Sequence, residues 1–149
     1  MNCYLDSSAL VKRYLLEKGS SEVLRLTADA DKVGTAAISR AEVVAALAKA
    51  ARIGTLVRED SELARHSFQA EWRYFARFRV TDLMIELACD LAWKYSLRGY
   101  DSVQLAAASM WQEAIDAPVV MATFDGQLWD AAVRVGLEPF PNDMRLLKV

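Results

Sequence analysis

The chain has 149 residues, of which 54% are hydrophobic and 26% are charged, a composition that excludes an intrinsically disordered protein. A chain of this length is expected to form one domain, residues 1–149, and to bury enough surface to fold without disulfides or a structural metal. Its 18 basic and 20 acidic residues give a net charge of -2, which excludes a strongly basic surface for non-specific nucleic-acid binding.

The first elements predicted along the chain are a short strand and a helix. The apolar run 3–5 indicates a strand that ends at Asp6, and the segment from Ser7 to Gly19 is expected to be a helix that the glycine stops. An acid as early as Asp6 argues against a signal peptide, and no apolar run approaches the roughly 18 residues that span a bilayer. We therefore expect a soluble, cytoplasmic protein.

The middle of the chain alternates between strand and helix patterns. Residues 32–38 indicate a second strand, and residues 39–54 indicate a helix that carries Glu42 in its first turn. An amphipathic segment from residue 58 to 78 follows, in which aromatic residues recur every three or four positions. This spacing is typical of a helix whose aromatic face packs against the core or a partner. Residues 78–81 are expected to form a short strand.

The last third of the chain continues the alternation. Residues 82–97 indicate a helix, and after a short break Asp101 is expected to open the next one. The continuous apolar run 119–124 is typical of a strand buried on both faces, and Asp125 follows it directly. A further helix and an edge strand near 137–140 complete the pattern. Short strands alternating with helices predict an α/β fold with a mostly parallel sheet.

Four acidic residues share one expected position in this fold. Asp6 and Asp125 follow predicted strands, while Glu42 and Asp101 lie at the start of predicted helices. Each could simply cap a helix, and the pair Ser39 and Glu42 has the spacing of a capping box. Four caps need not converge, however, whereas ligands of parallel α/β sheets bind outside the carboxyl ends of the strands. We therefore interpret the four acids as one site at this edge.

Converging carboxylates favour a particular chemistry. Two carboxylates about 4 Å apart repel by roughly 4 kcal/mol at an effective dielectric constant of about 20, so such a group takes up protons or binds a cation. With a single histidine in the chain, the predicted ligands are all oxygens, which select Mg²⁺ or Mn²⁺. Such an ion can present water to a phosphate, so the pattern favours a metal-dependent hydrolase or nuclease.

The segments around the four acids resemble a known family. YLDSSALVKRY, SRAEVVAAL, RGYDSVQLAAA and ATFDGQLWDAA resemble, in order, the four acidic motifs of PIN-domain ribonucleases, in particular the toxins (VapC) of VapBC toxin–antitoxin pairs. The resemblance implies a three-layer α/β/α sandwich and Mg²⁺- or Mn²⁺-dependent endoribonuclease activity, in a type II toxin–antitoxin system. It assigns both catalysis and metal binding to four residues: Asp6, Glu42, Asp101 and Asp125.

The resemblance also concerns residues beside these acids. Ser8 and Thr123 match polar residues that often accompany the first and last acids, and we expect them to hydrogen-bond carboxylates or water. Many relatives carry histidine two or three residues after the third aspartate, where this sequence has Val103 and Gln104.

The resemblance further implies partners. It implies an RNA substrate, a cognate antitoxin whose tail covers the site, and a homodimer. The aromatic residues of segment 68–78 and Trp111 would offer apolar surface for such protein contacts. RNA also needs cations, and four basic residues near the motifs are either a phosphate groove or ordinary solvated surface. They are Lys12, Arg13, Arg40 and Arg98.

Two other functions stay open at this point. One is a catalytically silent PIN-like module that keeps the fold for partner binding, which the full set of four acids disfavours. The other is a phosphoryl-transfer domain without nuclease activity, such as a receiver. Receivers use an acid after the first strand but also need a lysine after a late strand, and the stretch VVMATFDGQ contains none.

Overall fold

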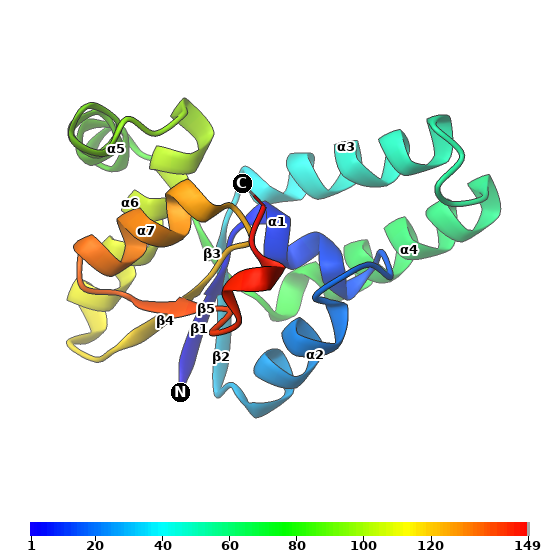
Figure 1. The fold of residues 1–149 in the computed structure, drawn as a ribbon, viewed down its shortest axis with the longest axis horizontal. Coiled ribbons are helices and arrows are strands. Elements are labelled where there is room, and N and C mark those ends of the chain that lie inside the picture. The colour runs from blue at the N-terminus through cyan, green and yellow to red at the C-terminus, as the bar shows by residue number, and fades with distance from the viewer. Residues whose placement is uncertain (149) are drawn as a thin grey trace.

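A five-stranded sheet forms the centre of the molecule in a computed structural model that describes residues 1–148. All its strand pairs are parallel, in the order β3-β2-β1-β4-β5. Helices lie on both sides of the sheet (Figure 1), which confirms the predicted α/β/α sandwich. The strands are β1 (Asn2–Leu5), β2 (Lys32–Ala36), β3 (Ala76–Phe78), β4 (Val119–Ala122) and β5 (Glu138–Phe140).

The helices divide into two layers (Figure 1). One layer holds the elements α1 (Ser7–Leu10), η1 (Val11–Arg13), α2 (Ser20–Asp29), α3 (Ser39–Arg52), α4 (Arg58–Glu71) and η2 (Trp72–Tyr74). The other layer holds α5 (Asp82–Tyr95), α6 (Gly99–Ile115) and α7 (Gly126–Arg134), and a last turn, η3 (Met144–Leu146), follows β5. Within residues 1–148, no helix has both the length and the apolar character that crossing a membrane requires.

Each central strand contributes to two hydrophobic cores, because successive side chains of a strand point to opposite faces of the sheet. In β1, Cys3 and Leu5 pack in the core under α1–α4, while Tyr4 packs in the core formed with α6. Every residue of β4 is buried. The apolar run predicted as a strand buried on both faces is therefore confirmed.

The first predicted helix is shorter than expected. It ends at Leu10, a 3₁₀ turn continues to Arg13, and the chain then runs in irregular structure before α2 begins at Ser20. The expected helix up to Gly19 is therefore wrong. The Lys12 ammonium folds back onto the Glu17 carboxylate and the Lys18 carbonyl, both at 2.8 Å, and these contacts hold the turn that replaces the helix.

The aromatic segment is also divided differently from the prediction. The helix α4 ends at Glu71, and the chain then turns into β3, which pairs with β2 two to three residues earlier than the predicted strand at 78–81. The rings of Phe68 and Trp72 pack edge-to-face at 5.5 Å inside the core under α1–α4. Phe78 instead packs against Trp111 on the other face of the sheet, at 5.1 Å.

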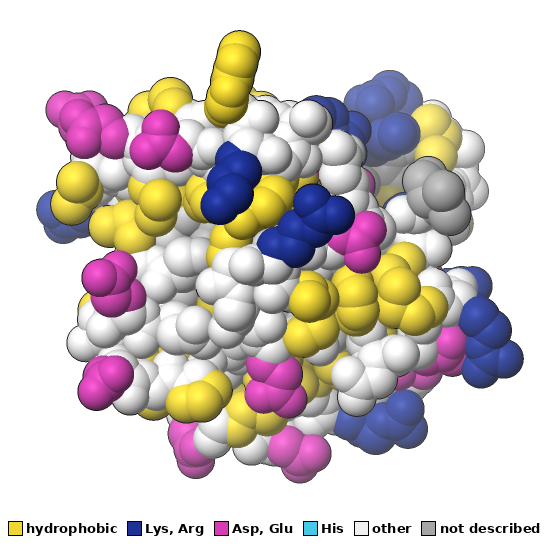
Figure 2. Space-filling model, turned by 60° about the vertical axis from the view of Figure 1, so that its left-hand side comes forward, with side chains coloured by type: hydrophobic (Ala, Val, Ile, Leu, Met, Phe, Trp, Pro, Cys, Tyr) yellow, Lys and Arg dark blue, Asp and Glu magenta, His cyan; other side chains and the backbone are white. Residues whose placement is uncertain are grey.

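Phe68, Trp72, Phe75 and Trp111 therefore form core and not a contact surface, which corrects the expectation that they serve a partner. Within this segment Tyr74 differs, because 72% of its surface is exposed. The surface itself mixes residue types. Figure 2 shows acidic, basic and hydrophobic side chains interspersed on the face that brings the α5–α7 side forward. The chain's lone histidine, His66, lies exposed on α4.

Candidate active site

The site lies where the strand order of the sheet reverses. From β1 the chain passes to β2 on one side and later returns to β4 on the other, so the crevice between β1 and β4 is the position where parallel α/β sheets bind ligands. Asp6 follows β1 directly, and Asp125 follows β4 by three residues. A cavity of about 370 Å³ opens there, and its lining includes all four predicted acids: Asp6, Glu42, Asp101 and Asp125.

Asp6 is the most buried of these acids, with 3% of its surface exposed. Its Oδ1 accepts hydrogen bonds from the Ser8 hydroxyl at 2.7 Å and the Ala9 backbone N–H at 2.9 Å, and its Oδ2 accepts from the Thr123 hydroxyl at 2.6 Å. Burial raises the pKa of Asp6 to about 6, although these hydrogen bonds act to lower it. Ser8 and Thr123 thus lie beside the first acid, as the sequence predicted.

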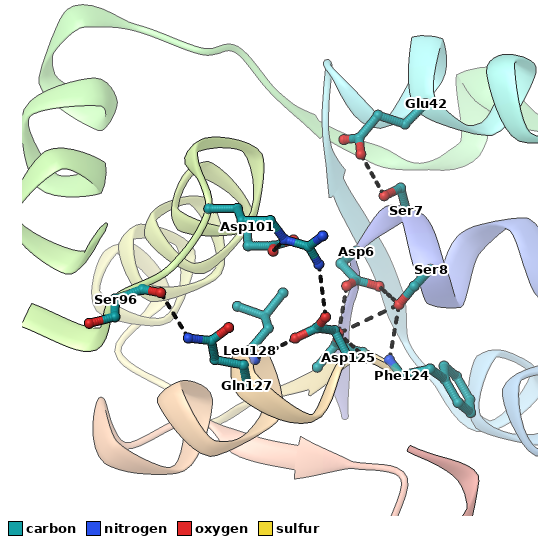
Figure 3. Close-up of polar contacts among 12 residues, drawn as sticks. Asp6, Ser7, Ser8, Glu42, Ser96, Asp101, Phe124, Asp125, Gln127 and Leu128 are labelled. Carbon is teal, nitrogen blue, oxygen red and sulfur yellow. Dashed lines mark hydrogen bonds and ion pairs between the residues drawn. The ribbon is translucent and has the colours of Figure 1, made fainter. Parts of the chain in front are cut away.

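Asp101 and Asp125 face each other across the cavity and share one cation. The Arg98 guanidinium donates from Nε to Asp101 at 3.2 Å and from Nη2 to Asp125 at 3.1 Å. Burial raises the pKa of Asp101, and the neighbouring charge of Asp125 raises it further against the opposing effect of Arg98. Figure 3 shows Asp6, Asp101 and Asp125 pointing toward the same space, with Glu42 approaching from α3.

Glu42 reaches the cavity from the first turn of α3. Its Oε2 accepts from the Ser7 hydroxyl at 2.8 Å, and its Oε1 accepts from the Gln104 side-chain amide at 3.1 Å. The alternative of a capping box at Ser39 and Glu42 is excluded, because Ile38 occupies the cap position and no side chain caps the helix. Ser39 is instead buried.

Two of the acids cap helices as well as lining the cavity. Asp6 accepts from the backbone at the start of α1, and Asp125 accepts from Leu128 N–H at 2.9 Å at the start of α7. Asp101 lies in the first turn of α6, which begins two residues earlier than expected, at Gly99. A carboxylate has about four acceptor positions, so a capping acid keeps lone pairs for a further ligand. Helix capping and a shared ligand site are therefore compatible functions of these acids.

Of the four basic residues proposed for a phosphate groove, Arg98 lines the cavity. Lys12 does not: only 4% of it is exposed, and its ammonium lies 4.4 Å from the centre of the Phe124 ring. Arg13 pairs with Glu71 at 3.3 Å and lines a different cavity. The groove prediction is therefore wrong for Lys12 and Arg13, because both cations have partners within the α1–α4 layer.

Arg40, the fourth of these basic residues, is exposed at the start of α3. Its guanidinium lies 5.7 Å from the centre of the Trp72 ring.

The sequence assigned no role to three residues that the structure places at the site. Ser7 and Gln104 hydrogen-bond Glu42, and Tyr100 lines the cavity with 62% of its surface exposed. The spacing of Gln104 from Asp101 contains a signal, because residues three apart lie on the same face of a helix. The sequence contains no comparable signal for Ser7.

The donor set fits a hard divalent ion. Carboxylate and hydroxyl oxygens dominate the cavity lining, and Mg²⁺ and Mn²⁺ prefer such ligands. Within residues 1–148, no three acidic, histidine or cysteine side chains converge as a ready-made metal cluster. Each acid is instead held by its own hydrogen-bond partners, so ion binding requires rotation of carboxylates that already line the same cavity.

The parallel sheet between two helical layers, with a carboxylate-lined cavity at its switch point, defines the class of α/β proteins with an acidic site at the carboxyl ends of the strands. Comparison with known proteins identifies the family within this class. The profile described as the PIN domain matches residues 3–133. The chain belongs to the PIN domain family.

Relatives and solved structures agree with this assignment. The chain is 32% identical to Ribonuclease VapC45 and to Ribonuclease VapC49, from two strains of Mycobacterium tuberculosis, over 95% of this chain and 96% of each relative. The fold is similar to that of FitAcB from Neisseria gonorrhoeae, with a TM-score of 0.66 at 15% identity over 93% and 96% of the two chains. The fold is also similar to that of VapBC2 from Rickettsia felis, which was solved bound to a promoter DNA fragment. Here the TM-score is 0.62 at 13% identity, over 95% of this chain and 100% of the other.

Proposed function

We propose that this chain is a Mg²⁺- or Mn²⁺-dependent endoribonuclease that hydrolyses RNA phosphodiester bonds, and that it is the toxin of a type II toxin–antitoxin system. The observation that carries the proposal is the gathering of four carboxylates, each from a separate motif of the sequence, around one cavity at the switch point of the sheet. Membership of the PIN family and the ribonuclease names of two relatives support it.

The cavity residues have two roles, binding the ion and orienting its ligands. Asp6, Glu42, Asp101 and Asp125 would hold the ion, which when bound supplies an activated water and neutralises charge on the phosphate. Ser8, Ala9 and Thr123 keep the Asp6 carboxylate oriented through three hydrogen bonds, two to Oδ1 and one to Oδ2. Because the four acids already line one cavity, ion binding requires only that their carboxylates turn from their protein donors toward the ion.

RNA contacts come from the exposed residues at the cavity mouth. The Arg98 side chain is 78% exposed, so its guanidinium can turn from the two aspartates to a phosphate once the ion neutralises them. Tyr100 offers an exposed ring beside it, on which an unpaired base can stack. Arg40, exposed on the first turn of α3, is a further candidate for phosphate contact.

The proposal includes two protein partners, an antitoxin and a second copy of the chain. Structures of toxin–antitoxin complexes among the proteins of similar fold support the first. The apolar side chains that α5 exposes, Leu83, Ile85 and Trp93, support the second. Light scattering on the purified chain tests the dimer, and a monomer at all concentrations contradicts it. The predicted cytoplasmic location is part of the same proposal.

A cleavage assay with matched variants tests the enzyme proposal. Single-stranded RNA is incubated with the protein after chelation and again after Mg²⁺ or Mn²⁺ is restored. We expect the metal to restore cleavage in the wild type, and Asp101→Asn to reduce it at least 100-fold. The control is Asp116→Asn, the same substitution at the other end of α6, which should cleave like the wild type.

Cleavage at the wild-type rate by Asp101→Asn would contradict the assigned role. Antitoxin binding without cleavage of any RNA would instead support the silent interaction module.

A further inference from the structure

The side-chain amide of Gln104 lies at the centre of a buried hydrogen-bond network. Only 1% of the residue is exposed. Its Nε2 donates to the Ser39 hydroxyl at 2.9 Å and to the Glu42 carboxylate at 3.1 Å, and its Oε1 accepts from the Tyr4 hydroxyl at 2.6 Å. One amide thus joins β1, the start of α3 and the acidic cavity.

The network fixes which end of the amide faces Glu42. The Tyr4 hydroxyl accepts a hydrogen bond from the Ala36 backbone N–H at 3.1 Å, so its own proton is free to point at Gln104. The amide oxygen must therefore face Tyr4, and the NH₂ group must face Ser39 and Glu42. The orientation follows from the sheet itself, because Tyr4 and Ala36 are residues of adjacent strands.

Gln104 supplies one of the two hydrogen bonds that hold the Glu42 carboxylate. Asp6 has three donors and Asp125 caps a helix of its own, whereas Glu42 receives one donor from Ser7 and one from Gln104. Glutamate also has a longer side chain, and ordering it costs more rotamer entropy. Both oxygens are held by single bonds from other elements, α1 and α6, and each keeps a lone pair for the cavity.

We propose that Gln104 is a positioning residue that fixes the Glu42 carboxylate for binding a divalent ion. This inference rests on the proposed function. It assigns a role in the metal site to a buried glutamine of α6.

The chemistry of the network explains why glutamine suits this position. The three partners require one acceptor, toward Tyr4, and two donors, toward Ser39 and Glu42. A primary amide supplies both donors and the acceptor. A neutral imidazole supplies one donor and one acceptor, and an imidazolium supplies two donors and no acceptor, so histidine satisfies at most two of the three.

The test measures Mn²⁺ affinity by calorimetry, independently of RNA cleavage. Gln104→Met keeps the length of the side chain and removes all three contacts. We expect its dissociation constant for Mn²⁺ to rise 10- to 100-fold, the usual effect of removing the partner of a metal ligand. Gln104→His should lie between Gln104→Met and the wild type, and it provides a folded variant if Gln104→Met does not fold.

Gln112→Met is the matched control. Gln112 lies on the same helix and also makes two hydrogen bonds, to Gly136 O at 3.1 Å and from Val119 N–H at 2.9 Å, away from the acidic cavity. Its loss should lower the melting temperature and leave Mn²⁺ affinity unchanged. A merely structural role for Gln104 predicts the same behaviour for both variants.

The variant Glu42→Gln distinguishes failure of the positioning role of Gln104 from failure of the proposed function. If the wild type binds Mn²⁺ and Glu42→Gln weakens binding, but both Gln104 variants bind like the wild type, the positioning role is overturned and the proposed function survives. If the wild type binds no Mn²⁺, the proposed function is overturned and the positioning role with it. In RNA cleavage, the positioning role predicts that Gln104→His lowers kcat and leaves KM unchanged.

Discussion

Burial of Asp6 makes the fold sensitive to pH. The folded protein raises the pKa of this carboxyl from 3.8 to about 6, so it favours the protonated form. Stability from this group is therefore fully present below pH 3.8 and is lost as pH rises through about 6. A shift of this size corresponds to about 3 kcal/mol, as an upper bound on the cost of charging Asp6 in the fold.

Asp6→Asn should remove this cost. In the presence of a chelator at pH 8, we expect the variant to have a higher free energy of unfolding in urea than the wild type, because asparagine is never charged. At pH 4 the advantage should disappear, since the wild-type carboxyl is then protonated in the fold. Equal stability of the two proteins at both pH values would contradict the raised pKa. Cleavage should be abolished throughout.

At the level of the single residue, the sequence identified the four acids that line the cavity but only some of the side chains that hold them. Asp6, Glu42, Asp101 and Asp125 stand in four separate motifs that spacing relative to strands and helices could locate. The contact between Tyr4 and Gln104 joins residues 100 positions apart, and no local pattern encodes it.

Among the elements, the turn between η1 and α2 supports the back of the site. Lys12 from η1 lies over the Phe124 ring, which immediately precedes Asp125. Gly19 fits closely under the same ring: its φ is +93°, and an added Cβ would lie 2.5 Å from a ring carbon. The cation that the sequence suggested for RNA binding therefore contributes to packing behind the β4–α7 connection.

Lys12→Met and Arg98→Met, the same substitution at two predicted RNA contacts, should behave differently. Lys12→Met should lose about 1–3 kcal/mol of stability and leave the salt dependence of KM for RNA unchanged. Arg98→Met should leave stability nearly unchanged, raise KM and reduce the slope of log KM against log salt by about 0.7, the loss of one phosphate contact. The opposite pattern, in urea unfolding and cleavage kinetics, would place Lys12 in the groove.

Sequence patterns predicted some boundaries of helices and strands but not others. The buried strand β4 was predictable because its apolar run is continuous and bounded. The division between α4 and β3 was not, because Trp72 and Phe75 continue the helical spacing of Phe68 although the helix has ended. Tertiary packing, which places all three rings in one core, overrides the local period there.

For the whole molecule, the class of fold was predictable because parallel strands require helical crossovers, and the sequence alternates accordingly. The strand order that brings β1 and β4 together was not predictable from that alternation. This order creates the switch point and, with it, the common cavity of acids from distant motifs.

Anomalous diffraction from crystals grown with Mn²⁺ would show whether the four acids hold a divalent ion, because it locates the ion without reference to activity. We expect a Mn²⁺ peak in the cavity between β1 and β4, about 2.1 Å from carboxylate oxygens of the four acids Asp6, Glu42, Asp101 and Asp125. In the same crystals the Arg98 guanidinium should have moved away from the two aspartates. A Mn²⁺ peak elsewhere on the chain, with these carboxylates still held by their protein partners, would contradict it.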